Sequence, residues 1–259
     1  MQANIDLSIW QMTAAYIFIL VLIVIVRFKG IPREKEILIS SLRMTIQLVL
    51  VGYILAFVFE HSHPVYTLGI ITIMLIFAIN NIFNRTILQL SSEIKKIIAL
   101  SMTLGILASI TYFVLIVLQV YPWYEPRYII PIAGMIIGNS MTGISLGVKT
   151  LVEGMTTHKQ LVEAALILGA TPKRASEQIV KSAFDAAMMP TINSMVGMGI
   201  VFLPGMMTGQ ILGGASPVIA IEYQIAVMLG IVGSVSLTVL LFVQLGYKTF
   251  FNSRSQIKL

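Results

Sequence analysis

Long apolar runs separated by shorter polar connections dominate the chain. Each run is close to the about 20 residues that a helix needs to cross a bilayer. The pattern predicts seven transmembrane spans, at residues 8–26, 37–59, 65–83, 97–120, 128–148, 191–213 and 223–246. The fifth and sixth of these runs are rich in Gly, Pro and polar residues, so a straight helix is less strongly indicated there. We therefore expect an all-α, polytopic membrane protein with a single transmembrane domain over residues 1–259.

The basic residues gather in alternate connections of this pattern. All but two of the 17 Lys and Arg residues lie in connections 27–36, 84–96 and 149–190 or in the C-terminal tail. Because Lys and Arg favour cytoplasmic connections, this asymmetry predicts an N-terminus outside and a C-terminus in the cytoplasm, as an odd number of crossings requires. The net charge of +6 is then a signal of topology, with a contribution from anionic lipid, and a nucleic-acid partner is not expected.

Composition excludes several other classes of protein. Hydrophobic residues make up 57% of the chain and charged residues 11%, with a mean hydropathy of +0.92, and so little charge would not cover a soluble domain. The chain has no Cys, hence no disulfide or thiolate metal site.

Residues 1–26 carry no Lys or Arg, which favours a retained first helix over a cleaved signal peptide. The Gly143-Ile144-Ser145-Leu146-Gly147 match to a hydrolase motif lies in an apolar run, where glycines at this spacing favour close helix packing.

The connection 149–190 contains a sharp corner between two short helices. Residues 159–168 predict one helix, and Gly169 suits the left-handed position just past its end. Thr171 is a good N-cap and Pro172 fits the first turn of a second helix, expected over 172–188. Pro190 is expected to begin the sixth span. The small residues at this corner allow another surface to approach closely.

The spacing at this corner resembles the EAA pattern of ABC transporter membrane subunits. Glu163-Ala164-Ala165 is followed by Gly169 after three residues and by Ile179 after nine more. In that family the corner is a coupling helix that docks on a cytoplasmic ATPase, which assigns this role to Glu163, Ala164, Ala165, Gly169, Ala170, Thr171 and Pro172. The family usually has Leu-Pro two residues after the Ile, where this chain has Lys181-Ser182. An ordinary amphipathic connection is the alternative.

Further segments are similar to the FetB-type permease family. They are Ile130 to Met141, Leu168-Gly169-Ala170-Thr171-Pro172, Leu203 to Gly209, Glu222-Tyr223-Gln224-Ile225, Arg43-x-x-x-Gln47 and Gly52-Tyr53. That family consists of ABC membrane subunits linked to bacterial iron export, with plant relatives linked to aluminium tolerance.

The resemblance implies a multi-pass permease subunit of the cell membrane that dimerises and pairs with a cytoplasmic ABC ATPase. This chain has no G-x-x-x-x-G-K-[ST] motif to hold ATP phosphates. We therefore expect no enzymatic activity and no cofactor in this chain, with ATP and Mg²⁺ on a separate ATPase. ATP-driven export of iron or a related metal species is the function implied. An importer-type permease for a small solute and an ATP-independent carrier or channel are the alternatives.

Several polar or broken positions within the spans are candidates for a transport pathway or gate. A Pro-Gly break in an apolar span is tolerated where the backbone is buried in protein or lines a cavity, although a packing kink is the alternative. Intramembrane polar groups can line a route or join helices by hydrogen bonds. Arg43 could instead extend to the cytoplasmic surface. The candidates are Arg43, Gln47, Asn139, Ser140, Pro204, Gly205, Met206, Met207, Thr208 and Glu222.

Metal ligands are scarce in the sequence. The spans contain no cluster of Asp, Glu or His that would provide ligands for a hard metal ion. His61 and His63, in an external connection, are the weak candidates for a metal site. The substrate itself is not indicated by these residues.

Overall fold

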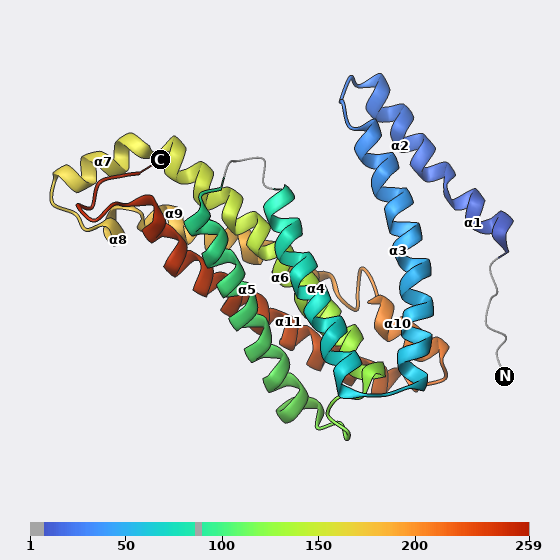
Figure 1. Ribbon diagram of the computed structural model, residues 1–259. Coiled ribbons are helices and arrows are strands. Elements are labelled where there is room, and N and C mark those ends of the chain that lie inside the picture. The colour runs from blue at the N-terminus through green and yellow to red at the C-terminus, as the bar shows by residue number, and fades with distance from the viewer. Residues whose placement is uncertain (1–7, 86–89, 259) are drawn as a thin grey trace. The chain divides into compact units, whose positions relative to one another are not determined.

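The computed structural model describes residues 8–85 and 90–258 and divides the chain into two compact units, Met1–His61 and Ser62–Leu259 (Figure 1). Within the described part the chain forms helices and no β-strand, apart from two isolated bridges. The all-α prediction is therefore confirmed. A single domain over residues 1–259 stays a prediction. Residues 86–89 of the predicted connection 84–96 lie outside the described part of the chain.

The first unit consists of three helices, α1 (Ile9–Ala15), α2 (Ile17–Phe28) and α3 (Glu34–Glu60). Ser8 begins α1 with a capping box that it forms with Gln11. A turn at Gly30, which has a φ of +66°, reverses the chain so that α2 and α3 pack together. Within this unit the helices leave most of their apolar side chains exposed. Such surfaces suit lipid or another protein rather than water.

The second unit is built around the long helix α6. Its elements are α4 (Pro64–Arg85), α5 (Ser92–Tyr112), the π-helix η1 (Phe113–Leu118), α6 (Pro126–Thr157), α7 (Lys159–Ile167), α8 (Pro172–Ala175), α9 (Glu177–Gly197), α10 (Gly205–Leu212), α11 (Pro217–Gly246) and the 3-10 turn η2 (Tyr247–Phe250). Helix α6 packs against α4, α5, α9 and α11. Fully buried aliphatic and aromatic side chains, including Ile136, Ile144 and Phe242, form the core between them.

Glycines bring the central helices close together. A Cβ atom at Gly143 would lie 2.9 Å from Val235 Cγ1 and 3.2 Å from the Ala187 carbonyl oxygen, and one at Gly147 would lie 3.4 Å from Ala187 Cβ. The predicted use of these two glycines in helix packing is confirmed. Helices α5 and α11 approach even more closely at Gly105, because a Cβ added there would lie 2.3 Å from Thr238 Oγ1.

Six stretches of helix among the described residues are long and apolar enough to cross a membrane. They are Ile9–Phe28, Glu34–Glu60, Pro64–Asn84, Ser92–Leu118, Pro126–Thr157 and Pro217–Phe250. They coincide with six of the seven predicted spans. The remaining predicted span, 191–213, is not one continuous helix, because α9 ends at Gly197 and α10 begins at Gly205, which agrees with the interruption expected in this run.

Two predicted boundaries around the corner are wrong. Helix α6 continues to Thr157, beyond residue 148, where the fifth span was predicted to end. It continues because Leu151 and Met155 remain buried while the charged Lys149 and Glu153 pair on its exposed side. The predicted helix 172–188 is divided at Ser176, and α9 passes through Pro190 instead of ending before it.

Candidate functional site

The corner between α7 and α8 is a glycine-terminated helix end followed at once by a capped helix start. Gly169 has a φ of +91°. Its N–H donates to the Leu166 carbonyl, and the Ala170 N–H donates to the Ala165 carbonyl at 2.9 Å, which is the Schellman arrangement. Thr171 then accepts a hydrogen bond from the Arg174 N–H at 3.4 Å. The predicted local geometry is confirmed, although the role of the corner is a separate question.

One side of the corner is fixed to the core and the other is exposed. Val162 is buried and Leu166 packs against the core cluster. At the tip, Ile167 is 86% exposed and Leu168 is 88% exposed. Two adjacent exposed aliphatic side chains beside a glycine turn form a small apolar knob.

The EAA residues lie along α7, directly before this knob. Glu163 is half-exposed, with its carboxylate 3.9 Å from Lys159 Nζ. Ala164 is exposed and Ala165 is half-buried. An equivalent i,i+4 pair, Lys149–Glu153 at 4.0 Å, lies on α6. Such exposed pairs contribute little to stability, so the carboxylate of Glu163 is available to a partner.

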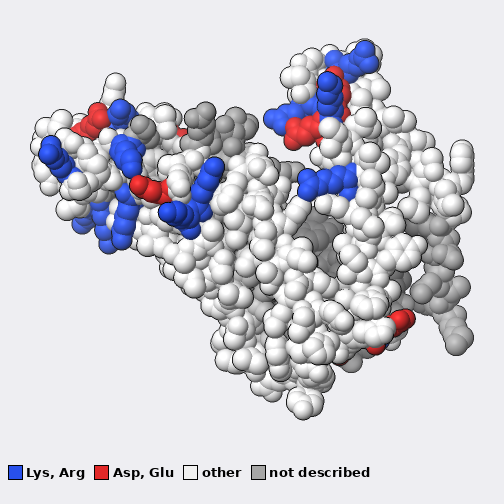
Figure 2. Space-filling view, viewed as in Figure 1, with Lys and Arg blue, Asp and Glu red and all other residues white. Residues whose placement is uncertain are grey.

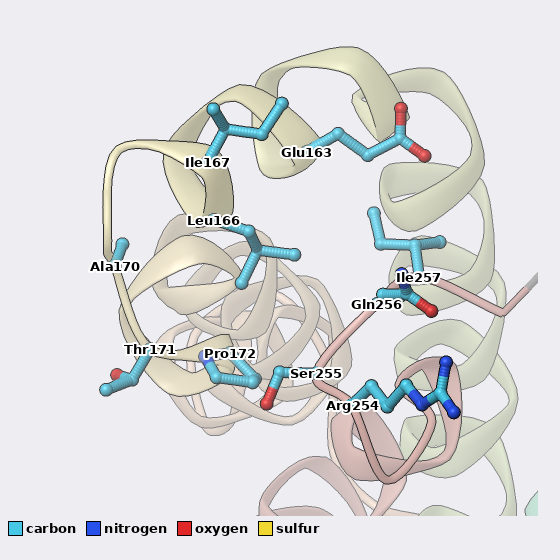
Figure 3. Close-up of a pocket in the computed structure, with 10 residues that line it drawn as sticks. All are labelled: Glu163, Leu166, Ile167, Ala170, Thr171, Pro172, Arg254, Ser255, Gln256 and Ile257. Atoms are coloured by element: carbon cyan, nitrogen blue, oxygen red, sulfur yellow. The ribbon is translucent and has the colours of Figure 1, made fainter.

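A cleft of about 600 Å³ lies between the corner and the end of the chain (Figure 3). Glu163, Leu166 and Thr171 line the corner side, and Arg254 and Ile257 line the other. The corner residues Ile167, Ala170 and Pro172 also line it, together with Ser255 and Gln256. The predicted corner is thus one wall of a cleft whose second wall was not predicted.

The second wall is a short hairpin at residues 250–258. The Lys258 N–H donates to the Phe250 carbonyl at 2.8 Å, and Phe251 and Ile257 form an antiparallel bridge. Lys258 Nζ pairs with the Glu93 carboxylate at the start of α5, 3.1 Å away. The only sequence signal for this hairpin is the run Asn-Ser-Arg-Ser at 252–255, whose residues favour turns.

The broken segment at residues 198–204 separates α9 from α10. Gly199 has a φ of +85°, and its N–H donates to the Phe202 carbonyl at 3.0 Å. Ile200 is 92% exposed and Val201 is 79% exposed. Both α9 and α10 pack against α11. The break is therefore a non-helical turn within an apolar region.

The candidate gate residues lie at this break and in the first turns of α10. Met207 is buried, whereas Met206 is half-buried against the core. The Thr208 hydroxyl donates to the carbonyl of Pro204 at 3.1 Å. Gly205, which begins α10, is exposed. These side chains offer thioether and hydroxyl groups next to the break.

A buried amide on α11 lies beside the break. Gln224 Nε2 donates to the sulfur of Met198 at 3.9 Å, while Gln224 Oε1 is buried and has no hydrogen-bond partner among the described residues. Glu222, two residues earlier on α11, is exposed. Sequence reasoning did not single out Gln224 as a functional residue. An unpaired buried acceptor is costly unless a ligand or water satisfies it.

The two polar candidate residues of α6, Ser140 and Asn139, form hydrogen bonds between helices or within their own helix. The Ser140 hydroxyl lies 3.2 Å from that of Ser234 on α11, in a fully buried interhelical hydrogen bond. Asn139 donates to the Met135 carbonyl of its own helix at 2.8 Å. Arg43 and Gln47 are exposed on α3, which belongs to the first unit.

Each candidate metal ligand makes local contacts. His61 Nδ1 lies 3.1 Å from the Phe57 carbonyl oxygen, and the two rings stack. His63 Nδ1 accepts a hydrogen bond from the Val65 N–H at 3.3 Å. Across residues 8–85 and 90–258, no three His, Cys, Asp or Glu side chains come together in a way that could hold a metal ion.

These long apolar helices, several of which pack around a buried core, define a polytopic α-helical membrane protein. The chain belongs to Uncharacterised protein family (UPF0014), which matches residues 9–251. It is 34% identical over 247 residues to the "Probable iron export permease protein FetB" of Escherichia coli, covering 95% of this chain and 93% of that protein.

Relatives in other organisms match over a similar share of the chain. The UPF0014 membrane protein YjkA of Bacillus subtilis is 34% identical over 96% of this chain and 97% of its own length. Protein ALUMINUM SENSITIVE 3 of Arabidopsis thaliana is 35% identical over 95% of this chain and 88% of its own length. No solved structure matches this chain. The resemblance to the FetB-type family is thus confirmed.

Proposed function

We propose that this chain is the permease subunit of an ABC transporter that exports iron or a related metal species across the cell membrane. The observation that carries the proposal is the corner at residues 163–172, where the carboxylate of Glu163 and the apolar knob of Ile167 and Leu168 come directly before the glycine that ends the helix. The name of the Escherichia coli relative supports iron export as the direction and the cargo. The chain acts as a homodimer with two ATPase chains, which bind the ATP and Mg²⁺.

In this proposal the corner faces the cytoplasm and docks on the ATPase. The exposed side chains of Ile167 and Leu168 enter an apolar groove of the ATPase, and Glu163 meets a cation at its edge. The cleft beside the C-terminal hairpin lies next to this contact and admits part of the partner's surface. Because α7 is joined to α6 through His158 alone, movement of the docked corner is passed directly to the central helix.

The same proposal assigns α9, the break and α10 to one discontinuous crossing beside α11. Seven crossings then place the N-terminus outside and the C-terminus in the cytoplasm. The break lines the route of the cargo, where non-helical backbone is tolerated only against a cavity or protein. The unpaired Gln224 Oε1 supports this assignment, because water or cargo in the route would satisfy it.

The docking role is tested by a charge reversal with a matched control. Glu163→Lys and Glu153→Lys each remove one i,i+4 pair on a helix of this region, but only Glu163 lies at the corner. We expect Glu163→Lys to lose co-purification with the ATPase and stimulated ATP hydrolysis, since like charges at a docked surface cost several kcal/mol. Glu153→Lys should retain both. Equal behaviour of the two variants contradicts docking at the corner.

Export is tested by flux in sealed inside-out vesicles, where the cytoplasmic face is outward. Added ATP should drive iron into vesicles that contain the permease and its ATPase. Iron that leaves preloaded vesicles on ATP addition would identify an importer, and flux that does not depend on ATP would identify a carrier or channel.

A further inference from the structure

A second cleft, of about 500 Å³, lies where α8 and the first turns of α9 meet the end of α11. Lys173, Arg174 and Lys181 line it on one side, and they outnumber the one carboxylate in its lining, that of Glu177. Figure 2 shows basic side chains gathered at the end of the second unit that carries α7 and α8. The cleft is therefore a polar recess with an excess of positive charge.

Two of the three cations of this recess pair with one carboxylate. The Glu177 carboxylate accepts from Arg174 Nη1 at 3.0 Å and pairs with Lys181 Nζ at 2.7 Å. These hydrogen bonds, from Lys181 first and Arg174 second, hold the pKa of Glu177 below its usual value, so the carboxylate stays ionised. Lys173 forms no ion pair with any residue in the described part of the chain. Part of the positive charge is thus left for a ligand.

The opposite wall belongs to a helix that continues into the membrane. Gln244 and Tyr247, near the end of α11, line the cleft. Four and seven residues before Gln244, on the same face of the helix, lie Leu240 and Leu237, which are 46% and 38% exposed. The polar recess is therefore continuous with an exposed apolar strip on a predicted span.

We propose that this recess binds the phosphate of an anionic phospholipid headgroup, with the acyl chains lying along Leu240 and Leu237. Arginine matches phosphate oxygens with two parallel N–H donors, and lysine adds a mobile positive charge. Basic recesses between spans bind anionic headgroups in this way. Free phosphate would use the cations but not the apolar strip, so the combination favours a lipid. The geometry is independent of the proposed transport function, which enters only in assigning the cytoplasmic leaflet.

The test is native mass spectrometry of the full chain, purified in detergent without an ATPase. Equal amounts of phosphatidylglycerol and phosphatidylcholine with the same acyl chains are added, and the retained lipid is identified. We expect the wild-type chain to retain phosphatidylglycerol preferentially. Lys173→Gln, which breaks no ion pair among the described residues, should weaken this preference roughly fivefold.

The triple variant Lys173→Gln/Arg174→Gln/Lys181→Gln should weaken the preference for phosphatidylglycerol at least about tenfold. The matched control, Lys95→Gln/Lys96→Gln/Lys149→Gln, removes the same charge from positions outside the recess and should retain the wild-type preference. Circular dichroism confirms that each variant keeps its helix content. If Lys173→Gln and the control behave alike, the recess is not a lipid site.

Two other results overturn the lipid assignment specifically. If excess inorganic phosphate displaces phosphatidylglycerol, the recess takes a free anion. If the recess variants keep the lipid preference but no longer co-purify with the ATPase, the cations belong to a protein interface. Because lipid retention is measured on the chain alone, its loss or persistence does not depend on whether the corner docks an ATPase.

Discussion

Replacing Gly169 with valine isolates the backbone geometry of the corner. Gly169 has a φ of +91°, which side chains rarely adopt, and a Cβ at this position would meet no atom within 4 Å. The main expected effect of Gly169→Val is therefore backbone strain, about 1–3 kcal/mol, since the added Cβ meets no other atom. At about 2 kcal/mol, the ratio of native to distorted corners falls roughly thirtyfold.

The expected result is a folded membrane protein with an altered corner. Gly169→Val should lose co-purification with the ATPase and its stimulated hydrolysis, while the midpoint of thermal unfolding of the purified chain stays near the wild-type value. Gly169→Asn should retain most of the co-purification and most of the stimulated hydrolysis, because asparagine tolerates positive φ far better than a β-branched residue. The measurements are affinity co-purification in detergent and ATP hydrolysis of the reconstituted complex.

The neighbouring Ala170, itself one of the proposed docking residues, provides a comparison that separates added bulk from backbone strain. Ala170→Val adds a branched side chain one residue later, where φ is not positive, so it should keep the corner's shape. If Gly169→Val retains wild-type association and coupled hydrolysis, either the strain is relieved without consequence or the corner is not the docking element. An equal loss in Ala170→Val would instead indicate that added bulk, and not backbone strain, is responsible.

Three further predictions concern topology, the pathway and packing. A reporter fused after residue 165 should be cytoplasmic and one fused after residue 218 extracytoplasmic; opposite labelling of either contradicts the orientation. Met206→Cys and Thr208→Cys should react with small polar thiol reagents, and more so in one nucleotide state, in a chain with no native Cys; inertness in every state favours a packing kink. Gly105→Ala should lower the free energy of unfolding by about 1–3 kcal/mol, because Thr238 must move, and an unchanged thermal midpoint contradicts the close contact.

The corner could be predicted because its geometry is set by residues next to one another. A glycine after a helix, a threonine at an N-cap and a proline in a first turn each act within a few residues. The structure accordingly reproduces Gly169, Thr171 and Pro172 in the predicted conformations. Their docking role depends on a partner chain and stays a prediction.

The features that sequence reasoning missed depend on contacts distant in the chain. The C-terminal hairpin meets the rest of the fold through Phe251 and Ile257, which pack against the core cluster, and through the pair of Lys258 with Glu93. No local pattern indicates these contacts. Helix α9 continues through Pro190 because its neighbours Ala187 and Thr191 are buried against other helices. Tertiary packing there outweighs the cost of a proline in a helix.

The length of α6 has a mechanical consequence. Its 32 residues form a rod about 48 Å long, about 18 Å longer than the hydrocarbon core of a bilayer. Pro131, the proline inside the helix, lies near the end opposite α7, so the part joined to the corner has no proline at which to bend. Gly143, where α6 approaches α9 and α11 closely, lies near the middle of the helix. We expect α6 to pivot at this contact. A sideways force on the corner therefore tilts the rod about this contact and displaces its far end in the opposite direction by a comparable distance.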